Sequence, residues 1–417
     1  MSEPREKAVK SIFRGSAIVL LGTIFSKVLS LIYRLAVGRV GVDDLGIIGV
    51  TMTVFSVAGV ISYIGIPRSV QKYISEYRGK DDLEGIRSTL QSGLILITAS
   101  STLIALLLFI GAPFLSNNIF NEPRAILPIR MIAVILPFRA WSNVFMKVTD
   151  SFERMEYSTF TGKIWNNSVQ LVIALALIYL GFGYIGAAFA YAFSFASGAF
   201  VAGYFAKKIF PGSMFERTGS RNYREIFTHA FPLMATGVLG LIIGNVDTLF
   251  LQYFKGTTVV GLYTAAFPFA TLITTAGGMF SGILLSNASK LVSQGNKKEL
   301  TTIFMTVTKW TSLVTVPAFL LIVFFPEIPL KLFGTEYLEA TTPLQILSFG
   351  FMISTVVGPV SSIYQAFDRT ELDFYTSLIL MISNLVLNLV LIPREGFWGG
   401  IVGAAAASSI SYLIIAG

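Results

Sequence analysis

Long apolar runs of roughly 18–25 residues recur along this chain, separated by short polar segments. A helix rises about 1.5 Å per residue, so a run of this length can cross the hydrocarbon core of a bilayer. The pattern predicts an all-α polytopic membrane protein with about 12 transmembrane helices. The expected spans lie near residues 12–36, 45–66, 87–110, 125–147, 159–180, 184–206, 229–252, 259–284, 301–325, 341–365, 372–392 and 398–416.

The first run, RGSAIVLLGTIFSKVLSLIYRLAVG, has a polar side as well as an apolar one. Ser16, Thr23, Lys27, Ser30 and Arg34 recur at helical spacing, which places them on one side of a helix. A cationic stripe on a membrane helix faces a protein interior or a water-filled cavity rather than lipid. This stripe is the first indication of transport.

The composition agrees with a membrane protein, because 54% of the residues are hydrophobic and only 13% are charged. A soluble domain would carry about twice that share of charge. The absence of Cys excludes disulfides and thiolate sites, and a single His, His229, argues against a His-based metal centre. The sequence contains no G-x-x-x-x-G-K-[ST] motif either. We therefore expect no metal and no cofactor.

Basic residues are distributed unevenly between the two sets of connecting segments. One set holds 20 of them: Arg5, Lys7, Lys10, Arg14, Arg68, Lys72, Arg78, Lys80, Lys147, Arg154, Lys163, Lys207, Lys208, Arg217, Arg221, Arg224, Lys290, Lys297, Lys298 and Arg369. The other set holds five: Arg39, Arg124, Lys255, Lys331 and Arg394. Since Lys and Arg gather in cytoplasmic loops, we expect a multi-pass cell (plasma) membrane protein with both termini in the cytoplasm. The net charge of +8 then needs no nucleic-acid partner.

Short sequence matches recur between the two halves at an offset near 215 residues. Phe152-Glu153-Arg154 matches Phe367-Asp368-Arg369, and Gly46 at the start of the second span matches Gly261 at the start of the eighth. Matches that keep one order and one offset indicate an internal repeat of six spans each.

The longest polar connector, residues 207–225, lies at the middle of the chain. We therefore expect an N-terminal six-helix bundle over 1–206, a cytoplasmic linker over 207–225 and a C-terminal six-helix bundle over 226–417. Two bundles of the same topology are related by a pseudo-two-fold axis along the membrane normal, with a central cavity between them. One bundle can then rock against the other.

Two segments carry a resemblance to a known family. They are RSVQKYISEYRGK at 68–80 and the stretch from Asp247 to the GLYTAA sequence at 261–266. With the repeat, they make the whole chain resemble the polysaccharide-flippase branch of the multidrug/oligosaccharidyl-lipid/polysaccharide exporter superfamily. The resemblance implies a flippase, not an enzyme, that moves a lipid-linked oligosaccharide across the membrane. Members of this branch often have fourteen spans, and this chain has room for twelve, which leaves open a further C-terminal portion.

Five cations lie inside the expected spans: Lys27, Arg34, Arg130, Arg139 and Lys309. A charge in the membrane costs several kcal/mol unless it is paired or hydrated, so these cations predict an electropositive cavity that binds a phosphate or pyrophosphate. Arg34 and Arg130 could instead reach the outer surface, and Lys309 the cytoplasm. Lys27 and Arg139 are too central in their spans for that.

Asp247 is the only acidic residue well inside a span. The repeat offset places it near the position equivalent to Arg34, so the two charges could form an extracellular gate that breaks on outward opening. Alternatively, Asp247 binds H⁺ or Na⁺ with Asn245 and Thr248, or forms a static ion pair.

Carboxamides occupy related places in the two halves. Asn166 and Asn167 lie on the fifth span, and Asn384 and Asn388 lie on the eleventh. Such groups can bond sugar hydroxyls of the substrate, although bonding between helices is their commoner use.

Three other functions would make different demands on the sequence. A cation-coupled multidrug exporter of the same superfamily would need an acidic cavity in the first half, where the spans carry cations instead. A flippase for the peptidoglycan lipid precursor is physically close to the first hypothesis. A membrane glycosyltransferase would need acidic or His-bearing outer loops, and the outer loops here are short. We therefore expect the partners to be a lipid-linked oligosaccharide and membrane lipids.

Overall fold

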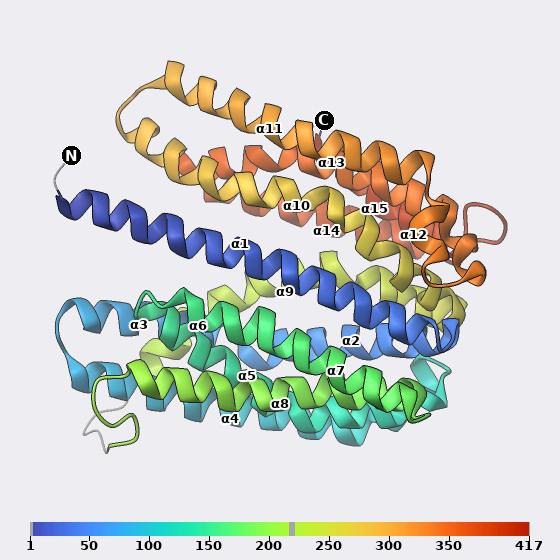
Figure 1. Cartoon of the computed structure of the whole chain (residues 1–417), viewed down its shortest axis with the longest axis horizontal. Coiled ribbons are helices and arrows are strands. Elements are labelled where there is room, and N and C mark those ends of the chain that lie inside the picture. Colours follow the sequence, from blue (N-terminus) through green and yellow to red (C-terminus); the bar gives the residue numbers. More distant parts are fainter. Residues whose placement is uncertain (1–2, 217–221, 417) are drawn as a thin grey trace. The chain divides into compact units, whose positions relative to one another are not determined.

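The computed structural model describes residues 3–216 and 222–416, so residues 217–221 of the expected linker 207–225 lie outside the described residues. The first half contains α1 (Glu3–Gly38), α2 (Val42–Tyr63), α3 (Ile66–Gly79), α4 (Leu83–Phe114), a π-helix η1 (Leu115–Ile119), a 3₁₀ turn η2 (Pro123–Ala125), α5 (Ile126–Ser151), α6 (Met155–Thr159), a second π-helix η3 (Phe160–Trp165), α7 (Asn166–Tyr179) and α8 (Gly183–Ile209). The second half contains α9 (Tyr223–Lys255), α10 (Thr257–Ser293), α11 (Lys297–Phe324), α12 (Glu327–Lys331), a 3₁₀ segment η4 (Thr335–Ala340), α13 (Thr341–Ala366), α14 (Thr370–Leu391) and α15 (Gly400–Ala416). Figure 1 shows this order of helices along the chain.

The all-α membrane fold expected from the sequence is confirmed. In the described part of the chain, 10 helices are long and apolar enough to cross a bilayer, and α15 is a shorter apolar helix. The expected span 159–180 is helical but not uniformly α-helical, because the π-helix η3 lies between α6 and α7. The expected span 229–252 lies within α9, where residues 237–255 form one of these apolar stretches.

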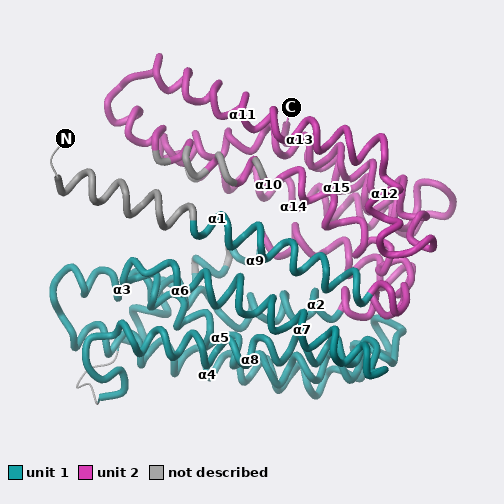
Figure 2. The backbone as a smooth tube through the Cα atoms, in the orientation of Figure 1, with its two compact units in different colours: residues 1–37, 51–238 teal, residues 38–50, 239–417 magenta. Residues whose placement is uncertain are grey.

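The chain forms two compact units, coloured separately in Figure 2. Unit 1 comprises residues 1–37 and 51–238, and unit 2 comprises residues 38–50 and 239–417. The borders fall at the C-terminal end of α1, inside α2 and inside α9. Each unit therefore includes a helical end from the other half of the sequence.

The two units repeat the same packing. In unit 1, α5 packs on α4 and α8, and α7 packs on α8. In unit 2, α13 packs on α11 and α15, and α14 packs on α15. The turns repeat as well, since Glu153 after α5 and Asp368 after α13 have φ of +62° and +57°. The internal repeat predicted from the sequence is therefore present in the backbone.

The core of unit 1 on the side of α3 is made by apolar residues of α3, α4 and α5. Helix α3 is strongly amphipathic, and Val70 and Ile74 on its apolar face are fully buried against Leu90 and Val144. The Arg and Lys side chains of α3 lie on its exposed face. Burial of this one face fixes α3 against the membrane helices.

A close crossing joins the N-terminal ends of α2 and α10, both inside unit 2. A Cβ atom added to Gly46 would lie 2.1 Å from the carbonyl oxygen of Thr257. One added to Gly261 would lie 2.1 Å from the carbonyl oxygen of Val42. Only glycine allows the backbones to come this close, which explains why both repeats have Gly at this position.

Candidate functional site

Arg139 of α5 lies among aromatic rings in unit 1. Its guanidinium carbon is 4.3 Å from the ring centre of Phe55, 5.2 Å from Phe195 and 5.9 Å from Tyr63. One guanidinium nitrogen donates to the carbonyl oxygen of Phe55 over 3.0 Å. Aromatic faces attract a cation without neutralising it. Arg139 is therefore held in place and remains charged.

The surroundings of Arg139 supply no counter-charge. Among the described residues, no carboxylate lies within 4 Å of its guanidinium group, and the membrane stretches 18–37, 51–63, 92–114, 126–147 and 166–206 of unit 1 contain no Asp or Glu at all. Asn143 orients the site, because its amide donates to Tyr63 Oη over 3.2 Å and to the Arg139 carbonyl oxygen over 2.9 Å. Arg139 is thus a half-buried cation with unused donors.

Arg34 of α1 belongs to the same neighbourhood. The Tyr191 side chain of α8 interacts electrostatically with both Arg34 and Arg139. Tyr33, next to Arg34, is buried and donates to the Ala187 carbonyl oxygen over 3.0 Å, which fixes this part of α1 on α8. The structure therefore brings together two of the cations that the sequence analysis selected.

Lys27 lies further along the polar stripe of α1 and is half-buried. Two neighbouring side chains of α1 are hydrogen-bonded to the fifth span: Thr23 of the stripe accepts from Lys163 Nζ, and Ser26 beside it accepts from Asn167 over 3.0 Å. The stripe thus packs against η3 and the start of α7. Lys163 was grouped with the cytoplasmic loops in the sequence analysis, and its place beside Lys27 was missed.

Arg130 and Lys309 lie elsewhere. Arg130 is nine residues before Arg139, which is two and a half helical turns, so the two side chains point to opposite sides of α5. Arg130 packs over the Phe109 ring at 5.1 Å. Lys309 belongs to unit 2 and lies on an exposed stripe of α11 with Met305 and Leu313. This stripe has the apolar character of a lipid-facing surface.

Asp247 of α9 is the centre of a buried polar cluster in unit 2. Tyr263 Oη and Ser408 Oγ each donate to Asp247 Oδ2 over 2.6 Å, and Asn388 Nδ2 donates to Oδ1 over 2.6 Å. Asn384 accepts from Asn388 over 3.1 Å and donates to Ser408 over 3.1 Å. Within the described residues, no Lys or Arg lies within 4 Å of the Asp247 carboxylate.

The four selected carboxamides all make hydrogen bonds between or within helices. Asn384 and Asn388 belong to the Asp247 cluster, and Asn167 bonds Ser26. With its amide oriented to suit its neighbours, Asn166 donates to the carbonyl oxygen of Ser194 over 3.1 Å. Sugar contact by these residues stays a prediction. So does the Arg34–Asp247 gate, since these residues belong to different units.

Two family models match the sequence. One, described as "Polysaccharide biosynthesis protein", matches residues 12–286, which is more than half of the chain. The other, the MatE model, matches residues 232–390.

Comparisons with individual proteins give the same result as the family models. The uncharacterized membrane protein MJ1068 of Methanocaldococcus jannaschii is 25% identical over 429 residues, covering 99% of this chain and 83% of that protein. The probable low-salt glycan biosynthesis flippase Agl15 of Haloferax volcanii is 24% identical over 195 residues, covering 46% of this chain and 40% of its own. A solved multidrug resistance MATE family transporter of the MOP superfamily, in an inward-facing conformation, has a TM-score of 0.79 at 19% identity, covering 96% of this chain and 95% of that one.

The match of the first family model, the flippase relative and the shared fold lead to one assignment. This chain belongs to the polysaccharide biosynthesis protein family, in the polysaccharide-flippase branch of the multidrug/oligosaccharidyl-lipid/polysaccharide (MOP) exporter superfamily, and is a membrane transporter rather than an enzyme.

Proposed function

We propose that this protein is a flippase that moves a lipid-linked (pyro)phosphate oligosaccharide from the cytoplasmic to the outer leaflet of the cell membrane by alternating access, for polysaccharide or glycan biosynthesis. The headgroup of such a lipid carries negative charge that must cross the hydrocarbon core. A cationic, partly hydrated protein surface lowers that cost.

The observation that carries this proposal is the uncompensated charge of Arg139. A guanidinium group offers five N–H donors in a planar fork that suits phosphate oxygens. The aromatic rings and the Phe55 carbonyl oxygen hold that fork in place, and Arg34 adds a second positive charge across Tyr191. An exporter of cationic drugs needs the opposite sign of charge, and the membrane stretches of unit 1 contain no carboxylate to supply it.

Asp247 supports a second element of the proposal, coupling to H⁺ or Na⁺. Its carboxylate is only 5% exposed and is surrounded by neutral oxygen and nitrogen groups. The amide oxygen of Asn388 in the same cluster is buried without a hydrogen-bond partner. A proton or a hard monovalent cation would satisfy both oxygen atoms.

The orientation of the chain follows from its charge distribution. The excess of basic residues in one set of loops supports cytoplasmic termini. Because the chain has no Cys, a Ser213→Cys variant would carry the only thiol. An impermeant thiol reagent should label it only from the cytoplasmic side.

The test of the proposal is flipping of a fluorescent lipid-pyrophosphate oligosaccharide in proteoliposomes. Arg139→Ala should slow flipping by about tenfold or more, because a charge-assisted contact contributes about 1.5–3 kcal/mol. Arg139→Lys should retain part of the rate, since it keeps the charge but loses the fork. Arg130→Ala, which removes the same charge from the opposite side of α5, is the matched control and should flip normally.

The same proteoliposomes distinguish the rival function. If the wild type does not flip the lipid but exports a cationic dye against an ion gradient, the protein is a drug exporter and the flippase proposal is wrong. If Arg139→Ala instead flips the lipid at the normal rate, Arg139 does not serve as the headgroup site, and the flippase activity has another mechanism.

A further inference from the structure

We infer that Lys163, on the π-helical segment η3, contacts the phosphate-bearing headgroup of the substrate and forms with Lys27 a second cationic site on unit 1. The inference rests on the proposed flippase function and adds a binding residue to it. It starts from the contact between α1 and η3.

The Lys163 ammonium group lies on the polar stripe of α1. It donates to Thr23 Oγ1, whose own proton is used in a bond of 2.6 Å to the Val19 carbonyl oxygen. Thr23 thus presents only a lone pair to Lys163. One helical turn further along α1 is Lys27, so two ammonium groups flank the same stretch of the helix.

The neighbouring groups hold Lys163 without neutralising it. Asn167 donates to the Lys163 carbonyl oxygen over 2.9 Å and to Ser26 over 3.0 Å, which ties η3 to α1. Among the described residues, no carboxylate lies within 4 Å of Lys163 Nζ. An ammonium group has three donors, and the bond to Thr23 uses one. Donors therefore remain for an anionic ligand.

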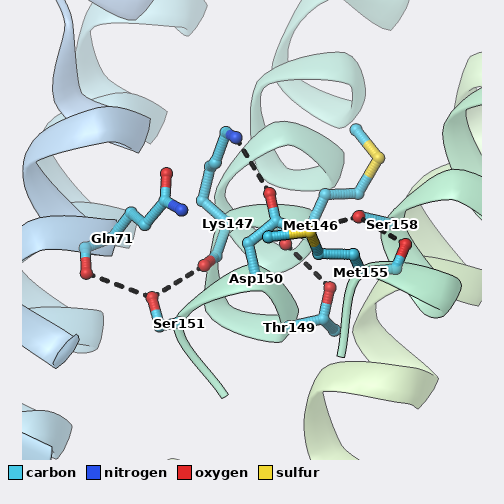
Figure 3. Close-up of polar contacts among 8 residues, drawn as sticks. All are labelled: Gln71, Met146, Lys147, Thr149, Asp150, Ser151, Met155 and Ser158. Atoms are coloured by element: carbon cyan, nitrogen blue, oxygen red, sulfur yellow. Dashed lines mark hydrogen bonds and ion pairs between the residues drawn. The ribbon is translucent and has the colours of Figure 1, made fainter. Parts of the chain in front are cut away.

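Lys147, another lysine of unit 1, is paired with a carboxylate. Figure 3 shows Lys147 at the end of α5, where its ammonium group donates to Asp150 Oδ2 over 2.9 Å. The other oxygen of Asp150 accepts from Ser158 over 2.5 Å, so the carboxylate is fixed on both sides. Lys147 is a structural cation with its counter-charge at hand. Lys163 has no such partner within the described residues.

The backbone around Lys163 is specific to the first half of the chain. Six residues, Phe160–Trp165, form a π-helix, and such wide turns inside helices are frequently found at functional sites. The equivalent helix of the second half, α14, is a regular α-helix, and Leu378 stands at the position 215 residues after Lys163. The second repeat keeps the helix without this π-helical stretch, so the shared fold does not require η3 or Lys163.

Two ammonium groups separated by hydroxyl and amide groups suit a diphosphate, which carries charge on two neighbouring phosphorus centres. Ile24 and Phe25, which point away from this stripe on α1, are exposed apolar residues. A lipid tail can therefore stay against α1 while the headgroup binds between α1 and η3.

The test is the affinity of purified full-length protein for a polyisoprenyl pyrophosphate, with the uncharged polyisoprenol as the second probe. Lys163→Gln keeps a neutral donor for Thr23 and removes the charge, so a purely structural role predicts normal binding. We expect Lys163→Gln and Lys163→Ala to bind the pyrophosphate about tenfold more weakly, and Lys163→Arg to recover most of the affinity. Polyisoprenol binding should not change. Lys147→Ala, which removes a paired lysine, should bind both probes like the wild type.

The outcomes separate the inference from the proposed function. Suppose that the wild type binds the pyrophosphate more tightly than the polyisoprenol and that Lys163→Gln shows the same preference. Lys163 is then structural and the inference is wrong, while the flippase proposal stands. If the wild type binds the pyrophosphate no better than the polyisoprenol, both fail. Thermal unfolding of each variant, compared with the wild type, shows whether weaker binding comes from a loss of folded protein.

Discussion

At the scale of single residues, the useful distinction is between cations that are held in place without a counter-charge and cations that are paired or lie on an apolar surface. Arg139 and Lys163 belong to the first kind, and Lys147 and Lys309 to the second. The sequence identifies every one of them as basic but does not say which kind it is. That depends on neighbours such as Phe55, which lies 84 residues away from Arg139 along the chain.

Part of the site could be predicted from the sequence, and part could not. Helical periodicity puts Arg130 and Arg139 on opposite sides of one helix, so their separation can be read from their spacing. Asp247, Asn384 and Asn388 were selected for separate roles, and only tertiary packing shows that they form one cluster. Lys163 was missed because a π-helix has no sequence pattern that distinguishes it from a regular helix.

His229, the only histidine, allows one pH dependence of the protein's stability to be assigned to a single residue. It lies before the membrane span of α9, where its Nδ1 is 2.9 Å from Ser69 Oγ and its ring packs edge-on against Tyr73. Burial, and then the positive charge of Lys72, lower the pKa of His229 below its ordinary value of 6.5. The neutral form is therefore favoured in the folded protein.

The folded state binds the His229 proton less tightly than the unfolded state, so its stabilising effect is complete above pH 6.5 and is lost as the pH falls through the lowered pKa. We expect the melting temperature of the wild type to fall on acidification from pH 7 to about pH 5. In His229→Gln this part of the fall should be absent. Parallel melting curves of the two proteins across this range would contradict the assignment.

At the scale of helices, the apolar runs were sufficient to find the spans, because a membrane requires long helices with satisfied backbone groups. The interruptions were not predictable in the same way. The π-helix between α6 and α7 and the short segments α12 and η4 depend on local backbone geometry. The matching turns at Glu153 and Asp368 had a sequence signal, since both follow Phe and precede Arg.

The crossing of α2 and α10 gives a prediction about helix packing. Gly46→Ala or Gly261→Ala should destabilise the protein by about 1–3 kcal/mol, because each new Cβ would overlap a backbone carbonyl oxygen that cannot move aside. The hydrogen bond of 2.6 Å from Thr258 Oγ1 to Asp43 Oδ1 at the same crossing would be strained as well. Thermal unfolding in detergent measures the effect.

A matched control is available on α9. Gly240 is also helical, but a Cβ added there meets no atom within 4 Å. Gly240→Ala should therefore be neutral or stabilise the helix by up to about 1 kcal/mol. Equal losses at Gly46 and Gly240 would mean that the close approach of α2 and α10 is not what requires glycine.

At the scale of the whole molecule, the two repeats share a backbone but differ in chemistry. Unit 1 carries the cations Arg34, Arg139 and Lys163 and no carboxylate in the membrane stretches of its helices. Unit 2 carries the buried carboxylate of Asp247. The two copies of the fold thus carry different groups: cations in unit 1 and a buried carboxylate in unit 2. This difference suits a protein in which unit 1 binds the headgroup and unit 2 binds the coupling ion.

This division predicts that the two activities can be lost separately. A bound ion stabilises the folded state in proportion to its occupancy, so Na⁺ added at constant pH should raise the melting temperature of the wild type. Asp247→Asn keeps the shape of the side chain and removes the charge that binds the ion. We expect this variant to lose the ion-dependent rise and to keep its affinity for the polyisoprenyl pyrophosphate within about twofold.

Arg139→Ala should behave in the opposite way, with weak pyrophosphate binding and a normal ion-dependent rise, because Arg139 belongs to unit 1 and the Asp247 cluster to unit 2. Both variants should flip the lipid slowly, since transport needs the headgroup site and the driving ion together. If Asp247→Asn retained the ion-dependent rise, the ion would bind elsewhere and the carboxylate would serve packing alone. If it also lost headgroup binding, the two repeats would not divide the work in this way.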